Sequence, residues 1–177
     1  SITNIANNDY KNWSFSNIIG VAHDAEGLDK VEIVIKRVPD MYWDGVSWND
    51  GIGNLKWLTV GTSDGYENWF SSANWVDGQP VSIWMRVTDT AENKTVYNSE
   101  SVSDIENDLN RAVYFLYDES TPTTSVSYPA ADNDSFNVQK GTFTGLCEEP
   151  DIGQQSGSSE VKVQIQRAGD GKWWVAN

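Results

Sequence analysis

Apolar and polar residues alternate along much of the chain. Apolar side chains occupy every second position over 31–35, 81–87, 113–117 and 161–165, and turn-forming residues such as those of 49–54 separate the runs. A period of two is typical of a half-buried β-strand, because successive side chains point to opposite faces of a sheet. The pattern therefore predicts an all-β fold of short strands joined by hairpins.

One segment departs from this pattern and predicts a short helix before the strand over 113–117. Ser103 and Glu106 have the Ser-x-x-Glu spacing of a capping box. Ile105, Leu109 and either Ala112 or Val113 would then lie on one side of the helix.

The chain also repeats itself. Residues 1–6 match 125–130, residues 19–22 match 144–147, and residues 31–37 match 161–167. Asp40 and Trp43 extend the last match, because they align with Asp170 and Trp173 at the same offset. Self-similarity of this kind indicates a repeat architecture. Pro122 and the hydroxyl residues around it predict a connector over 117–124. We therefore expect residues 1–120 to form one complete repeat and residues 121–177 to begin a second.

The second copy stops just after the position that matches Trp43, so it would hold only the first strands of a repeat. So few strands cannot close a sandwich, and an open sheet edge exposes backbone hydrogen-bonding groups. We expect the second repeat to be completed either by more of the polypeptide or by a neighbouring molecule, in the latter case through strand exchange between copies. Ser1 is preceded by no Met or signal-like apolar stretch, which indicates processing or truncation.

Three stretches carry a resemblance to a known family. They are the alternating run 85–93, which ends Asp-Thr-Ala-Glu-Asn, the Asp-Glu-Ser-Thr-Pro connector within 115–123, and the segment 20–33. The chain resembles the immunoglobulin-like (Ig-like) repeats of bacterial and archaeal surface proteins, although Glu92 stands where those repeats usually have Gly. The resemblance implies tandem Ig-like β-sandwiches, the first with a Trp-rich hairpin insertion. It also implies an extracellular or cell-surface location, with neighbouring repeats or copies of itself as partners.

Charge narrows the range of partners. Twelve basic residues against 26 acidic ones give a formal net charge of -14, which argues against nucleic acid and anionic lipid surfaces as partners.

No apolar run is long enough to span a membrane. Cys147 is the only cysteine, so neither an internal disulfide nor a Cys-based metal site can form.

The acidity has two interpretations, a solvated surface or divalent-cation binding. Loop carboxylates and amides are the ligands that calcium prefers, but the same side chains also cap their own turns. No cofactor is required by the sequence, and calcium is the one that its acidic loops would suit. The candidate ligands are Asp24, Glu26 and Asp29, close together in one loop, and Asp89, Asn93 and Asp118, which this fold would bring together near the joint between repeats.

Tryptophan offers a second kind of candidate site. Exposed indole faces can stack on sugar rings, whereas buried ones pack in a core or at a subunit interface. The alternation over 81–87 places Trp84 on the opposite face of the predicted strand from Val81, Ile83 and Met85. The candidates for a glycan or interface contact are Trp43, Trp48 and Trp84.

Catalytic patterns are weak. His23 is the only histidine, and no Gly-x-Ser-x-Gly elbow is present. We therefore expect no enzyme but a structural and interaction module of a surface fibre, filament or stalk. The alternative is a carbohydrate-binding adhesin domain that uses exposed Trp residues.

Overall fold

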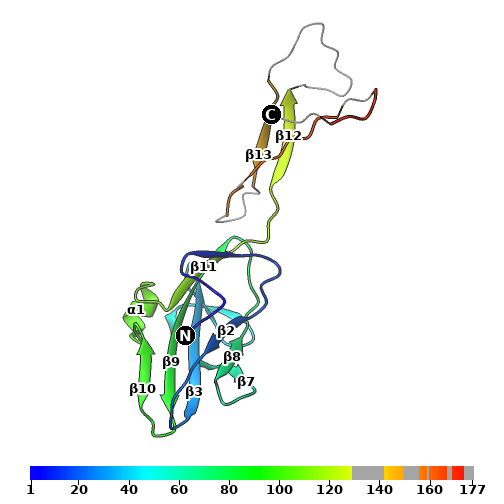
Figure 1. Ribbon diagram of the computed structural model, residues 1–177. Coiled ribbons are helices and arrows are strands. Elements are labelled where there is room, and N and C mark those ends of the chain that lie inside the picture. Colours follow the sequence, from blue (N-terminus) through cyan, green and yellow to red (C-terminus); the bar gives the residue numbers. More distant parts are fainter. Residues whose placement is uncertain (129–141, 150–155, 159, 167–168, 174–177) are drawn as a thin grey trace. The chain divides into compact units, whose positions relative to one another are not determined.

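The computed structural model describes residues 1–128, 142–149, 156–158, 160–166 and 169–173. The chain divides into two compact units, one of residues 1–120 with 151–156 and the other of residues 121–150 with 157–177 (Figure 1). Strands are the main regular secondary structure in the described part of both units, which confirms the all-β prediction.

The larger sheet of the first unit is built around two long strands, β3 and β9, which pair antiparallel along their lengths (Figure 1). β11 joins the other edge of β9, and β1 pairs parallel with β11. β4 and β5 extend the sheet beyond β3, while β6 pairs with β3 and β10 with β9. The strands are β1 (Asp9–Lys11), β3 (Leu28–Arg37), β4 (Met41–Trp43), β5 (Trp48–Asp50), β6 (Leu58–Thr59), β9 (Gln79–Asp89), β10 (Lys94–Tyr97) and β11 (Val113–Tyr117).

A smaller sheet covers one face of this larger one. It has the order β2–β8–β7 and consists of β2 (Ile18–Val21), β8 (Asn68–Ser71) and β7 (Gly61–Thr62). Ile18 and Trp69 from the smaller sheet pack in one core with Ile33, Ile83 and Phe115 from the larger sheet. The main core of the first unit therefore lies between two sheets, which is the arrangement of a β-sandwich.

The strand predicted over 31–37 is buried more completely than its alternation suggests. Val31, Ile33 and Ile35 face the main core as expected. Val34, on the opposite face, is also fully buried, because it packs against Trp84 and other residues of a second, smaller core. The prediction of a half-buried strand was wrong here, since a helix and a 3-10 turn (η1, Ile52–Asn54) lie over the face expected to meet water.

The predicted helix exists but begins earlier and is shorter. α1 spans Val102–Glu106 with Ser101, not Ser103, at its N-cap. Ile105 is fully buried, as expected, whereas Leu109 is 53% exposed. The chain leaves the helix through Asp108 and Asn110, both of which have positive φ. Leu109 therefore no longer follows the helical periodicity on which the prediction rested.

The second unit contains a two-stranded sheet of β12 (Thr123–Tyr128) and β13 (Thr144–Glu148) in its described part. Residues 161–165, predicted as a strand, have no strand partner within the described segments, and Arg167 of the same match lies outside them. In the first unit, the matching residues pair with β9. No described segment of the second unit supplies such a partner, so the local alternation alone does not produce a strand there.

The first pairing of each unit has the same register. Ile2 forms an antiparallel bridge with Gly20 in the first unit. Val126 pairs antiparallel with Gly145 in the second. The sequence match aligns Ile2 with Val126 and Gly20 with Gly145, so the same two positions meet in both units.

Candidate functional site

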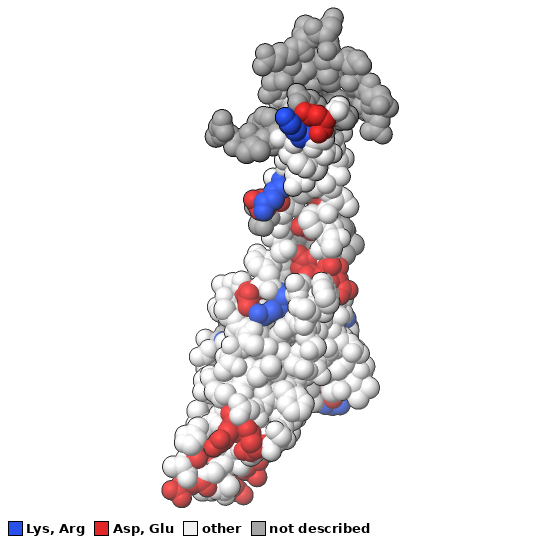
Figure 2. All heavy atoms as spheres, turned by 45° about the vertical axis from the view of Figure 1, so that its right-hand side comes forward, with Lys and Arg blue, Asp and Glu red and all other residues white. Residues whose placement is uncertain are grey.

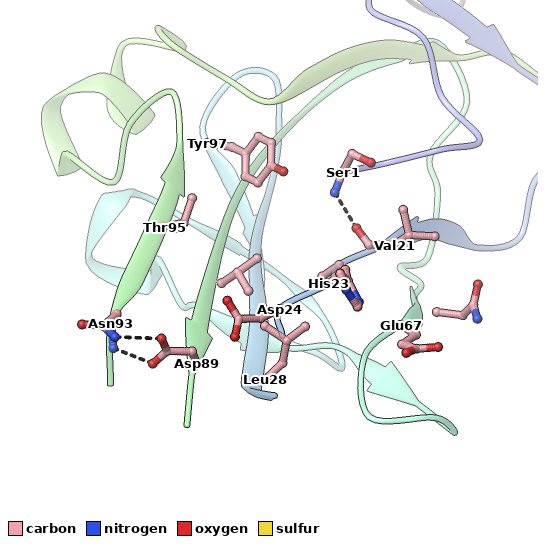
Figure 3. Close-up of a pocket in the computed structure, with 13 residues that line it drawn as sticks. Ser1, Val21, His23, Asp24, Leu28, Glu67, Asp89, Asn93, Thr95 and Tyr97 are labelled. Carbon is pink, nitrogen blue, oxygen red and sulfur yellow. Dashed lines mark hydrogen bonds between the residues drawn. The ribbon is translucent and has the colours of Figure 1, made fainter. Parts of the chain in front are cut away.

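A pocket of about 570 Å³ opens at the end of the first unit where β9 turns into β10 (Figure 3). His23 and Asp24 reach it from the loop after β2, Glu67 comes from the residue before β8, and Asp89 and Tyr97 come from β9 and β10. The pocket therefore combines acidic groups, the only imidazole of the chain and one partly exposed aromatic ring.

Asp89 and Asn93, both predicted as ligands, meet in this region and bind each other. The Asn93 side-chain amide donates to Asp89 Oδ2 and the Asn93 backbone amide donates to Asp89 Oδ1, both at 2.8 Å (Figure 3). The Ala91 backbone amide also donates to Asp89 Oδ1, at 2.9 Å. These hydrogen bonds, first the one from the Asn93 side chain, hold the pKa of Asp89 below its usual value. The Asp89 carboxylate thus shapes the β9–β10 turn, as the turn-chemistry interpretation expects.

The loop before β3 uses its acidic residue in the same way. Asp24 Oδ1 accepts a hydrogen bond from the Glu26 amide at 2.9 Å, and Thr90 donates from its hydroxyl to the Glu26 carbonyl oxygen at 3.2 Å. Asp29 lies on β3 with an exposed side chain. Asp24 and Asp89 line one pocket, whereas Glu26 and Asp29 do not line it.

Asp118 is not brought to this group. The residue before it, Tyr117, pairs with Gln79 at the start of β9, whereas Asp89 is the last residue of that 11-residue strand. At about 3.3 Å per residue the two carboxylates are roughly 30 Å apart. The expectation that Asp89, Asn93 and Asp118 meet was therefore wrong, because β9 and β11 run antiparallel. Within the described residues, no group of three or more His, Cys, Asp or Glu is arranged to hold a metal ion.

Carboxylates gather at the end of the first unit that carries the pocket, seen at the lower end of Figure 2. Asp24, Asp29, Asp64 and Glu67 are all exposed there. The nearby Lys30 ammonium lies 3.7 Å from Glu32 of the sheet rather than over this patch. The end is consequently acidic, which agrees with the interpretation of a solvated surface.

The three tryptophans predicted for a glycan or interface contact are largely inside the molecule. Trp84 is fully buried and donates its indole N–H to the Leu109 carbonyl oxygen at 2.9 Å. Trp43 is 5% exposed, and its ring centroid lies 5.4 Å from that of the half-buried Trp48. The Arg37 guanidinium lies 5.0 Å above the Trp48 ring. Trp43 and Trp84 therefore present no ring face on which a sugar could stack.

Besides Trp173 of the second unit, which is 56% exposed, the sequence reasoning missed Trp13 of the first unit, with 76% of its surface accessible. It lies between Asn12 and Ser14, whose side chains hydrogen-bond each other at 2.7 Å. Turn-forming neighbours and the absence of alternation around it were the available signals of exposure.

The second unit exposes an apolar groove of about 520 Å³ between β12, β13 and residues 161–164. Phe143 and Leu146 are 52% and 51% exposed, and Val161 and Val163 are 57% and 66% exposed. Clustered apolar side chains of this kind usually mark a surface that another segment or molecule covers. This groove was not predicted as a site, although the alternation over 161–165 placed Val161 and Val163 on one apolar face.

No helix in the described segments is long and apolar enough to cross a membrane. Comparison of the chain with protein-family models, with curated proteins and with solved structures finds no match.

Proposed function

We propose that the protein is an extracellular structural and interaction module, part of a surface fibre or stalk built from Ig-like β-sandwich repeats. The observation that carries this proposal is the shared register of the first strand pairing, Ile2 with Gly20 and Val126 with Gly145. Two units that begin with the same pairing at sequence-matched positions support a chain of similar modules in series.

The contrast in burial between matched positions supports the same proposal. Val31 is fully buried in the first unit, while its match Val161 is 57% exposed. Ile18 is fully buried, while Phe143, at the matching position, is 52% exposed. Residues that form a core in one copy and a surface in the other are expected where the second copy is completed by additional strands.

The chemistry of the first unit also suits a structural role. The candidate ligands Asp24 and Asp89 cap turns, and the tryptophans Trp43 and Trp84 fill cores. Trp43 and Trp84 give no support to the carbohydrate-binding alternative, because these two rings are not accessible to a ligand. That alternative would rest on the exposed Trp13 instead. We propose that partners bind through strand pairing rather than through a ligand pocket.

The location can be tested with antibodies against the purified chain, applied to intact and to permeabilised cells of the source organism. An extracellular module is expected to be labelled on intact cells, and immunogold electron microscopy should place the label on fibres or stalks. An antibody to a cytoplasmic protein serves as the control and should label only permeabilised cells. Labelling that requires permeabilisation would contradict the proposal.

A further inference from the structure

In the first unit, the strand β2 has a partner on each side. Ile2 bridges to Gly20 on one side, and β8 pairs antiparallel on the other, with Gly20 opposite Trp69 and Ile19 opposite Phe70. A Cβ atom on Gly20 would overlap both the Trp69 ring and the Ser1 carbonyl oxygen. Glycine at this position thus allows the indole to lie directly on the backbone of β2.

The matching glycine of the second unit has only one of these two neighbours. A Cβ atom on Gly145 would overlap the carbonyl oxygen of Ser125, the residue that matches Ser1. The nearest atoms found around that position, within the described residues, all belong to the backbone of Ser125 and Val126. The contact with the preceding strand is therefore kept, whereas no ring of the described residues lies as close to Gly145 as the Trp69 ring lies to Gly20.

The second edge of β13 is also unpaired in the described part of the unit, since the sheet consists of β12 and β13. An isolated two-stranded hairpin is marginally stable in water, and an unpaired edge is a template for another strand. Phe143 stands where the first unit has Ile18, which β8 and the larger sheet bury completely. A strand added at this edge would cover the Phe143 side of the apolar groove.

We propose that the unpaired edge of β13 binds an antiparallel β-strand of a partner polypeptide that places an aromatic residue on Gly145. The strand would follow the β2–β8 register, with residues of the Asn-Trp-Phe-Ser type opposite Leu146, Gly145, Thr144 and Phe143. Backbone hydrogen bonds would supply affinity, and the aromatic position would supply selectivity. The inference rests on the repeat organisation in the proposed function but not on the extracellular location.

The strand is not expected to come from β8 of a second copy. Trp69 is 1% exposed, and β8 is paired on one side with β2 and on the other with β7. Its release would open the main core of the copy that gave it up. A partner strand of similar sequence carries no such cost.

The test uses the full chain and a fluorescein-labelled peptide with the sequence of residues 66–73, measured by fluorescence polarisation. A peptide with alanine in place of tryptophan is the matched control and is expected to bind at least about tenfold more weakly, because a seated tryptophan dominates small interfaces. The chain variant Phe143→Ser should also weaken binding several-fold, whereas Val102→Ser, an exposed change in the first unit, should leave it unchanged.

The only thiol, Cys147, tests the register directly. If the peptide pairs with β13 as β8 pairs with β2, the register can be continued by one residue beyond Leu146. The peptide residue at the position of Glu67 then lies opposite Cys147. A peptide with cysteine there should form a disulfide with Cys147 under mild oxidation, and a peptide with cysteine at the position of Ser71 should not.

Failure of the peptide to bind, or equal binding of the tryptophan and alanine peptides, would overturn the inference. Self-association of the chain would also overturn the inference if sedimentation velocity shows that Phe143→Ser abolishes it and that the peptide does not compete with it. The edge of β13 would then belong to a second copy. None of these outcomes affects the cell-labelling result, so the two proposals can fail separately.

Discussion

Glu32 shows how single residues stabilise the larger sheet. Its carboxylate accepts two hydrogen bonds from Arg86 on the neighbouring strand, at 2.8 and 3.1 Å, and the Arg86 guanidinium lies 4.2 Å from the Trp57 ring. Burial by itself would raise the pKa of Glu32, but the hydrogen bonds and charge of Arg86 outweigh it, so this pKa lies below its usual value.

The lowered pKa of Glu32 predicts a pH dependence of stability. A carboxyl whose pKa is lower in the folded than in the unfolded chain stabilises the fold above the unfolded pKa, and that contribution disappears as the pH falls through the folded pKa. We expect the free energy of unfolding to decrease from pH 5 to pH 3 and to decrease less in Glu32→Gln. Urea unfolding at both pH values measures the difference. Glu67→Gln, an exposed control, should behave like the wild type, and equal slopes in all three proteins would contradict the prediction.

Lys36 is buried and holds the end of α1. Its ammonium donates to the carbonyl oxygens of Ile105 and Glu106 at 3.1 and 2.6 Å. We predict that Lys36→Met lowers the free energy of unfolding by about 1–3 kcal/mol, because two carbonyl groups at a helix C-terminus lose their donor. Lys56→Met, at an exposed site 3.7 Å from Asp44, is the control and should change stability by less than about 0.5 kcal/mol. Equal effects of the two changes, measured by urea unfolding, would refute the assignment.

At the scale of elements, α1 determines which residues of the larger sheet are buried. Ile105 is the buried residue of the helix, and it packs with Val34, Tyr42 and Trp84 in the second core. Sequence periodicity predicted a helix here and correctly identified Ile105. It could not place Trp84 beneath the helix, because that contact joins residues far apart in the chain.

The contribution of this small core can be measured by two substitutions in the same helix. We expect Ile105→Ala to lower the free energy of unfolding by about 2–4 kcal/mol, since it leaves a cavity beside Trp84. Val102→Ala, at a position 57% exposed, should cost less than about 0.5 kcal/mol. Chemical denaturation followed by tryptophan fluorescence compares the two variants. A small loss in Ile105→Ala would mean that α1 does not stabilise the sheet.

At the scale of the whole molecule, sequence-matched positions have different surroundings in the two units. Val31 lies in the main core of the first unit, whereas Val161 lines the exposed groove of the second. The same side chain should therefore contribute differently to stability in the two places.

Alanine at each of these positions tests that difference. Val31→Ala is expected to lower the free energy of unfolding by about 1.5–3 kcal/mol, the value of burying a valine side chain. Val161→Ala should be nearly neutral in the chain alone. Thermal unfolding followed by circular dichroism distinguishes the two variants, and a comparable loss in both would show that residues 161–165 are already packed as β3 is.

The local pattern determined the class of fold and several strands. Alternation placed Val81, Ile83 and Met85 on one face of β9, and all three lie in the main core. The same pattern failed at Val34, which is buried on the face expected to meet water, and at residues 161–165, which have no strand partner in the described part. Alternation reports which side chains share a face of an extended segment, but a strand also requires a neighbouring strand to pair with.

The candidate sites depended even more on tertiary structure. The sequence by itself determined the acidic charge, the residue types and the repeat that aligns Gly20 with Gly145. The tertiary structure decided that Asp89 caps a turn far from Asp118, and that Trp84 lies beneath a helix. Strand direction sets which loops share an end of the sheet, and long-range packing sets which rings meet water. Neither is encoded in the spacing of residues along the chain.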